Sequence, residues 1–175
     1  KAKIGSNNGE KLINDQKIYI DHRNKNVSFT KLNFINSKIE NIRVIKATNF
    51  DYFSKKAKDI FFSRGFKVTN LSDRMGMRLE GNKLDNIVSS NIKSEGLIKG
   101  AVQVPSDGNP IIMLADHGTI GGYPKIANVI SADFDKVAQL TPGSLIKFKE
   151  VSLKEAERLF HLYLLETKNI VSQIV

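Results

Sequence analysis

The chain has 175 residues, of which 41% are hydrophobic, and its formal net charge is +9. This length fits one domain with a sizeable core, with or without a short appendage. No apolar run approaches the roughly 18 residues that span a membrane, and we expect no secretory signal. The absence of cysteine excludes disulfides, thiolate metal ligands and a cysteine nucleophile. These features together predict a cytoplasmic protein that does not bind a membrane.

The positive charge raises the question of nucleic-acid binding. However, the lysines are spread along the chain, and only four tyrosines and no tryptophan are available to stack on bases. We therefore expect no nucleic-acid partner.

The first 45 residues have mixed polarity. A turn is predicted at residues 5–10, a short strand at 17–20 and a polar connector at 21–26, followed by a strand at 41–46.

Residues 49–64 carry apolar side chains three and four positions apart, which predicts an amphipathic helix. Asn49 is available as its N-cap, and Gly65 marks its end.

Alternation and short apolar runs predict the strands of the main domain. These strands are expected at residues 66–69, 75–79, 101–104, 111–115, 126–130 and 144–150. A short helix is expected at 132–140, with Asp133 and Asp135 near the positive end of its dipole, and a turn at 141–143.

The last helix begins with a capping box, Ser152 and Glu155, and is expected to reach Lys168 or beyond. It is apolar on too many sides to face a single core. The apolar residues are Leu159, Phe160, Leu162, Tyr163, Leu164 and Leu165. Either the helix crosses a barrel end and is partly covered by residues 170–175, or it is a docking surface for a partner.

Residues 99–140 hold two apolar runs that flank a glycine-rich connector, with polar groups where the runs end. This pattern is typical of a β scaffold that presents a small site on its loops. Gln103 lies in an apolar strand, where a buried amide needs partners, so we expect it to point into a wet cavity and to recognise a ureido or lactam group.

Several motifs support a resemblance to a known family. They are Gln103-Val-Pro-x-Asp-Gly-x-Pro, Leu114-Ala-Asp, Thr119-x-Gly-Gly-Tyr-Pro-Lys-Ile-Ala, Ser72-Asp-Arg-Met-Gly-Met-Arg-Leu-Glu-Gly, Ser131-Ala-Asp and Ala138-Gln-Leu-x-Pro-Gly. Over roughly residues 40–155 the chain resembles the biotin-dependent carboxyltransferase domain family. That family includes allophanate hydrolase subunit 2, the C subunit of 5-oxoprolinase, the carboxyltransferase part of urea carboxylase, and the antagonist of a sporulation-kinase inhibitor (KipA).

The resemblance implies a mainly β (α+β) fold, a cyclophilin-like β-barrel with two or three helices. It covers only the second half of the family's usual length. It therefore divides the chain into an N-terminal extension at 1–39, which looks like the tail of a missing first half, a barrel subdomain at 40–151 and a C-terminal helix at 152–175. Lys46-Ala-Thr stands where the family usually carries Gly-Pro-Gln.

The catalytic candidates are Asp116 and His117, which would move a proton, and the backbone of Gly121 and Gly122, which would donate hydrogen bonds to an oxyanion. The alternatives are a surface or core histidine and a plain turn that requires positive φ.

The remaining candidates would bind substrate. Arg74 and Arg78 are four residues apart and would hold a carboxylate, unless they pair with Asp73 and Glu80. The other binding candidates are Gln103, Asp107, Thr119, Tyr123 and Lys125. Asp107 also suits a tight turn, and Lys125 also suits a strand surface. No histidine spacing indicates a metal site.

Under this resemblance the chain is a subunit or half-module of an amide-acting enzyme, a carboxyltransferase or an ATP-dependent 5-oxoprolinase. The alternatives are a regulatory binding module that antagonises a kinase inhibitor, and an inactive fragment. We expect no cofactor on this chain, with carboxybiotin carried by a partner or ATP used in the assembled complex. The expected partners are a companion subunit of the KipI type (the B subunit of 5-oxoprolinase), a separate N-terminal half, and a small amide or lactam substrate.

Overall fold

The computed structural model of the protein describes residues 13–17 and 41–172. The described residues belong to two units, with residues 13–17 in the first and residues 41–172 in the second. The turn, strand and connector expected between residues 5 and 26 lie almost wholly outside the described residues. The second unit contains both the barrel and the C-terminal helix, and everything below concerns this unit.

Nine strands are assigned in the described residues. They are β1 (Asn41–Lys46), β2 (Phe66–Val68), β3 (Gly76–Glu80), β4 (Glu95–Gly96), β5 (Ala101–Gln103), β6 (Ile111–Met113), β7 (Ile120–Gly121), β8 (Lys125–Val129) and β9 (Leu145–Glu150). The helices are η2 (Phe50–Tyr52), α1 (Lys55–Ser63), η3 (Ser131–Asp133), α2 (Phe134–Ala138) and α3 (Leu153–Ser172).

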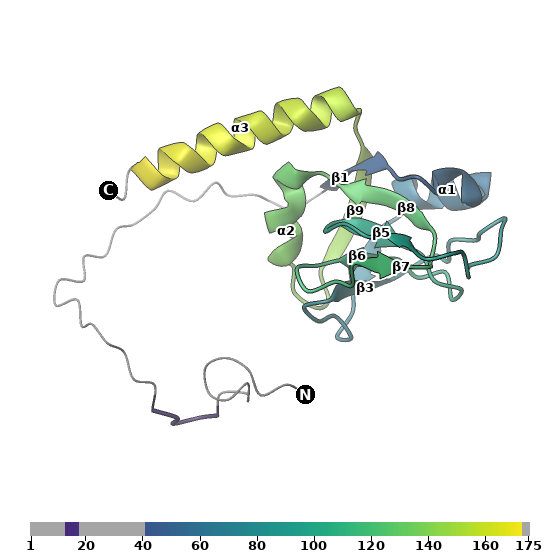
Figure 1. The fold of residues 1–175 in the computed structure, drawn as a ribbon, viewed down its shortest axis with the longest axis horizontal. Coiled ribbons are helices and arrows are strands. Elements are labelled where there is room, and N and C mark those ends of the chain that lie inside the picture. Colours follow the sequence, from purple (N-terminus) through teal and green to yellow (C-terminus); the bar gives the residue numbers. More distant parts are fainter. Residues whose placement is uncertain (1–12, 18–40, 173–175) are drawn as a thin grey trace. The chain divides into compact units, whose positions relative to one another are not determined.

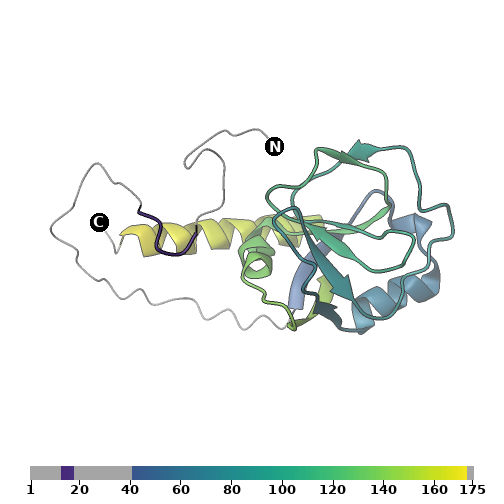
Figure 2. The ribbon, with the colours of Figure 1, turned by 90° about the horizontal axis from the view of Figure 1, so that it is seen from below.

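Seven strands form a closed barrel in the order β1-β8-β5-β6-β3-β2-β9, and β4 and β7 form a separate two-stranded sheet. The barrel closes through parallel pairing of β1 with β9, whereas the other barrel pairs are antiparallel. The strands curve around a common centre in Figure 2. The predicted mainly β barrel with two or three helices is confirmed.

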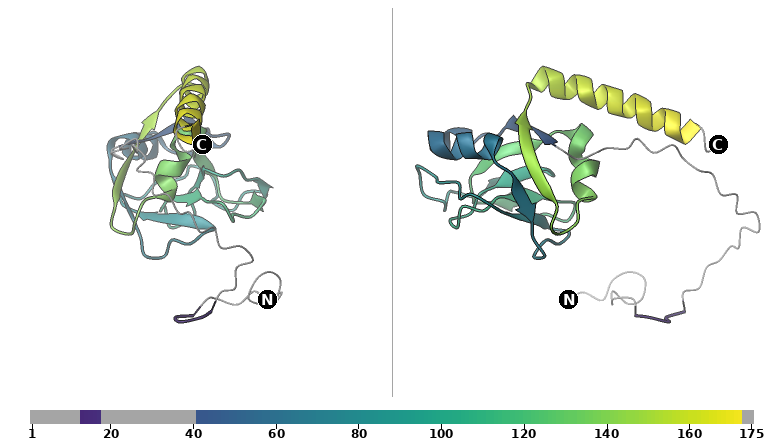
Figure 3. Two further views of the ribbon diagram at one scale, coloured as in Figure 1. Left: turned by 90° about the vertical axis from the view of Figure 1, so that its left-hand side faces the viewer. Right: turned by 180° about the vertical axis from the view of Figure 1, so that it is seen from behind.

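The core fills the barrel and extends to α1. Phe61 of α1 stacks on Phe148 of β9, with ring centroids 4.4 Å apart. Figures 1 and 3 show α1 and α2 on opposite sides of the strands. Because aromatic and branched side chains fill the interior, it is a packed core rather than a ligand cavity.

The helix predicted at residues 49–64 is wrong in its first turn and its cap. Phe53 is extended and makes an isolated antiparallel bridge with Asn86, which separates η2 from α1. The N-cap of α1 is Ser54, whose Oγ accepts a hydrogen bond from the Ala57 amide at 3.0 Å. Asn49 makes no cap hydrogen bond and uses its side chain elsewhere.

The helix predicted at 132–140 is η3 followed by α2, and Asp133 is not a solvated dipole partner. Its carboxylate is fully buried and accepts hydrogen bonds from the Arg43 backbone amide at 2.9 Å and the Arg43 Nε at 2.8 Å. Burial alone would raise the pKa of Asp133, but the hydrogen bonds from Arg43 outweigh it and hold this pKa below its ordinary value. This ion pair fastens η3 to β1.

The C-terminal helix begins as predicted. The Glu155 amide donates to Ser152 Oγ at 3.2 Å, while the Glu155 carboxylate pairs with Arg158 instead of closing the capping box. α3 contacts η3, and the Tyr163 hydroxyl donates to the Asp135 carboxylate. No helix in the described residues is long and apolar enough to cross a bilayer.

Candidate functional site

Strand register brings four of the barrel strands into one row of side chains. Gln103 of β5 is paired with Lys125 of β8 on one side and with Ile111 of β6 on the other, and Ile111 is paired with Arg78 of β3. Directly paired residues of antiparallel strands project from the same face. Their neighbours Val102, Ile112 and Met77 belong to the buried core, so Gln103, Ile111 and Arg78 lie on the outer face. The register of β5 and β8 shifts by one residue between Val102 and Gln103, and Lys125 is placed by its pairing with Gln103.

A small flap, which we define as β4 and β7 together with Leu97, lies against one end of this row. A Cβ added to Gly121 would lie 2.7 Å from Leu97 Cδ1 and 3.0 Å from Gln103 Nε2. At Gly122 an added Cβ would lie 2.7 Å from the backbone oxygen of Ile92. Neither glycine has positive φ, so close packing, and not turn geometry, requires glycine here.

The flap covers Gln103, which is only 4% exposed. Its Nε2 donates to the Tyr123 carbonyl oxygen at 3.0 Å, and this acceptor fixes the orientation of the amide. Its Oε1 accepts no hydrogen bond from the described residues. Among the described residues, Asn86 Oδ1 is the only side-chain oxygen or nitrogen that is both fully buried and without a partner. Gln103 Oε1, which also lacks a partner, is therefore in contact with solvent. Gln103 Oε1 is therefore an acceptor available to a ligand.

Next to Gln103 lies a buried polar network. The Lys125 ammonium is 2.5 Å from Glu95 Oε2 and 3.4 Å from the Gly96 carbonyl oxygen. Asn49, 2% exposed, accepts from the Lys125 amide at 3.1 Å and donates to Glu95 Oε1 at 3.4 Å. The hydrogen bond from Lys125 holds the pKa of Glu95 below its ordinary value, so this carboxylate is ionised at neutral pH.

Sequence reasoning misses Asn49 and Glu95 as site residues. The position of Asn49 suggests a helix cap, and no periodicity marks the segment that contains Glu95. The one local signal is an asparagine just before an apolar helix, which capping explains equally well.

Asp116 and His117 are not beside Gln103. They follow the end of β6, whereas Gln103 pairs with its first residue. Asp116 accepts from Arg74 Nε at 2.6 Å and Nη2 at 3.0 Å, and these bonds lower the pKa of its carboxyl group. His117 Nδ1 is 2.6 Å from the Gly118 oxygen. The structure therefore does not bring the predicted proton-transfer pair together with the predicted amide reader.

The two arginines have different surroundings. Arg78 is exposed on the row, two strands from Gln103. Arg74 lies before β3 and turns its guanidinium to Asp116. In this structure Arg74 is already paired with Asp116, and the carboxylate site at Arg74 and Arg78 stays a prediction.

The other binding candidates are also dispersed. Asp107 forms a tight turn with Asn109, whose amide donates to Oδ1 at 3.1 Å. Thr119 is exposed, with its carbonyl bound to the Leu97 amide. Tyr123 is 41% exposed and serves Gln103 through its backbone oxygen.

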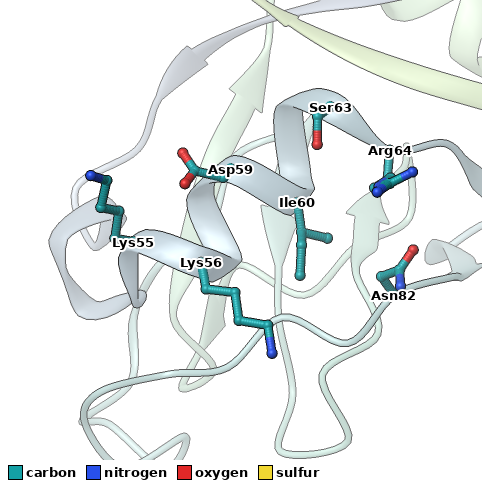
Figure 4. Close-up of a pocket in the computed structure, with 7 residues that line it drawn as sticks. All are labelled: Lys55, Lys56, Asp59, Ile60, Ser63, Arg64 and Asn82. Atoms are coloured by element: carbon teal, nitrogen blue, oxygen red, sulfur yellow. The ribbon is translucent and has the colours of Figure 1, made fainter.

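Three hollows of the described surface lie away from Gln103 and Lys125. One of about 590 Å³ lies along the outer side of α1, and Figure 4 shows Lys56, Arg64 and Asn82 around it. Another, of about 420 Å³, contains Asp107 but neither Gln103 nor Lys125. Among the described residues, no group of three or more histidine, aspartate or glutamate side chains is placed to hold a metal ion.

We therefore define the candidate site as Gln103, Lys125, Asn49, Glu95 and Gly121. It combines a free amide carbonyl, a buried ammonium group and a closely packed flap. Such a set can bind a planar group that carries both a hydrogen-bond donor and a partly negative oxygen.

Comparison with known proteins gives this geometry a family context. Residues 1–150 match the family model described as carboxyltransferase domain, subdomain A and B. The chain is 40% identical over 135 residues to the C subunit of 5-oxoprolinase from Haemophilus influenzae, covering 75% of this chain and 44% of that protein. It is 31% identical over 118 residues to urea amidolyase of Lachancea kluyveri, covering 62% of this chain and 6% of that protein.

A solved structure gives the same result for the fold. The crystal structure of K. lactis urea amidolyase superposes with a TM-score of 0.70 at 30% sequence identity, covering 74% of this chain and 8% of that protein. The chain thus spans less than half the length of the relatives that it matches. The matched residues include the whole barrel and every residue of the candidate site, so this chain belongs to the carboxyltransferase domain family with subdomains A and B.

Proposed function

We propose that this chain is a subunit or half-module of an amide-acting enzyme, of the type represented by the C subunit of 5-oxoprolinase and by urea carboxylase. The substrate is a small amide, lactam or ureido compound. The chain works in a complex with a companion subunit, and carboxybiotin or ATP, where used, is bound by the assembled complex. The cysteine-free composition suits a reducing compartment such as the cytoplasm.

One observation carries this proposal. A buried glutamine whose Nε2 is already engaged offers its carbonyl oxygen alone, so it accepts a hydrogen bond from a ligand N–H group. A lactam or urea presents that N–H beside its own carbonyl. The Lys125 ammonium, one strand away, supplies the positive charge that stabilises negative charge developing on that carbonyl. The names of two relatives, a 5-oxoprolinase component and a urea amidolyase, point to the same substrate class.

The test is a turnover assay of the assembled complex. Wild type and Gln103→Ala are each reconstituted with the companion subunits, and ATP-dependent hydrolysis of 5-oxoproline is measured. Loss of a hydrogen bond to a buried acceptor corresponds to about a tenfold or larger fall in kcat/KM. Gln139→Ala is the matched control, because this glutamine is exposed and its side chain donates a hydrogen bond to the Asp135 carbonyl oxygen, away from the candidate site.

Folding is checked for each variant by circular dichroism and by its urea midpoint. Turnover by Gln103→Ala at the wild-type rate would refute the assigned role of Gln103. If no complex hydrolyses 5-oxoproline, the same comparison is repeated with urea and carboxybiotin as substrates. Absence of turnover with all of them would leave the regulatory module as the better description.

A further inference from the structure

The helix α3 exposes several large apolar side chains. Phe160 is 37% exposed, Leu162 44%, Leu164 38%, and Leu153 and Leu165 are about three-fifths exposed at 63% and 59%. The contact that holds the helix is made with η3 and through Tyr163 to Asp135. α3 also follows the residues that match the family model, so the family's barrel does not account for it.

Three of these side chains form one stripe. Leu153 and Phe160 are seven residues apart, and Leu164 follows four residues later. At 3.6 residues per turn these positions fall on the same side of the helix, with the spacing of a coiled-coil seam. Ala156, Leu159 and Tyr163 are less exposed than the stripe, so they mark the face of α3 that packs on the rest of the domain. The stripe lies next to that face.

We infer that a second copy of this chain covers the stripe, with the two α3 helices antiparallel about a two-fold axis between Phe160 and Leu164. In that arrangement Phe160 of each copy packs on Leu164 of the other. An interface around a two-fold axis must be self-complementary, and an aromatic and an aliphatic residue one turn apart meet that requirement.

Two charged residues on the side of the helix that carries the stripe complement each other in the same arrangement. Glu157 is three residues before Phe160, and Lys168 is four residues after Leu164. An axis midway between Phe160 and Leu164 puts Glu157 of one copy opposite position 167 of the other. Lys168 of that other copy is one residue further along. Both side chains are exposed, and neither forms an ion pair with another described residue. The dimer gains two symmetric Glu157–Lys168 pairs.

The experiment is light scattering of the whole chain during size-exclusion chromatography, over a concentration series. We expect a mass of twice the 19.6 kDa monomer at the upper concentrations. Leu164→Glu should give a monomer throughout, because it buries a carboxylate against Phe160. Leu145→Glu is the matched control, since Leu145 is 63% exposed on β9, away from α3, and this variant should remain dimeric.

The charge exchange tests the orientation of the helices. Glu157→Lys and Lys168→Glu should each weaken the dimer about three- to tenfold, and the double exchange should restore it. A monomer at every concentration, or a dimer unaffected by Leu164→Glu, overturns the proposal. The proposal is also overturned if wild type forms no homodimer but binds the companion subunit, and Leu164→Glu does not bind that subunit. Failure of the double exchange to restore affinity overturns the antiparallel pairing.

Discussion

Removing Glu95 from the Lys125–Glu95 ion pair should destabilise the protein more than removing Lys125. The side chain of Lys125 is 8% exposed and that of Glu95 is 40% exposed. Glu95→Ala leaves an ammonium group in a buried position with the Gly96 carbonyl oxygen, at 3.4 Å, as its remaining acceptor among the described residues. Lys125→Met instead leaves a carboxylate that is free to turn towards water.

The magnitudes follow from that difference. Removing one partner of a fully buried ion pair costs about 3–5 kcal/mol, because the other charge is left uncompensated. Water at the exposed carboxylate screens part of this, so we expect Glu95→Ala to lower the free energy of unfolding by about 2–3 kcal/mol. Lys125→Met should cost about 1 kcal/mol or less, since its chain keeps the apolar contacts of the lysine stem. The double variant should resemble Lys125→Met.

Urea unfolding of wild type, both single variants and the double variant completes a double-mutant cycle. The same series has a pH dependence. The pKa of Glu95 is lowered in the folded protein, so the stabilisation is present above the ordinary glutamate value and is lost as pH falls through the lowered one. Wild type should therefore lose more stability in acid than Lys125→Met. A Lys125→Met variant that is as destabilised as Glu95→Ala would refute this account of the site.

Two further predictions concern the flap and the η3 contact. Gly122→Ala should lower the protection free energy of the Ile92 amide, measured by hydrogen exchange, by about 1–3 kcal/mol, because the new Cβ would meet the Ile92 carbonyl oxygen. Gly96→Ala is the control: an added Cβ there has no neighbour within 4 Å, so the same quantity should change by less than about 0.5 kcal/mol. Equal effects of the two substitutions would contradict close packing at Gly122. Asp133→Asn should cost about 2–4 kcal/mol in urea unfolding at neutral pH. Because the pKa of Asp133 is lowered by folding, the wild type keeps this advantage above the ordinary aspartate pKa and should lose it as pH falls through the lowered one. A difference between the two proteins that stays constant throughout that fall would show that the carboxylate charge is not what stabilises η3.

Short apolar runs are enough to predict most of the barrel strands. A run such as Ile111–Met113 is continuously apolar and flanked by turn residues, and these local features indicate a strand without any knowledge of its partners. The two-residue strands of the flap carry no such run. Their pairing depends on Gly121 and Gly122 accepting close neighbours from residues 92–97, which is a property of the folded protein.

The site can be predicted only in part, for a related reason. Gln103 stands out because a polar residue inside an apolar strand needs a specific explanation. Asn49 and Lys125 are 76 residues apart, and nothing local to either indicates that they bind each other. Spacing along the chain pairs Arg74 with Arg78, whereas the fold pairs it with Asp116 across two chain segments. Such spacing predicts contacts within one element, and these contacts join different elements.

The protonation state of the site also indicates what it does not do by itself. Glu95 is the carboxylate nearest in the network to Gln103 and Lys125, and its lowered pKa makes it a weak proton acceptor near neutral pH. Asp116, held by Arg74 at the other end of β6, is no better placed. Under the proposed function, this site binds and polarises an amide, and we expect the group that moves the proton to come from another part of the proposed complex. This expectation is the reason for assaying the Gln103 variant in the assembled complex.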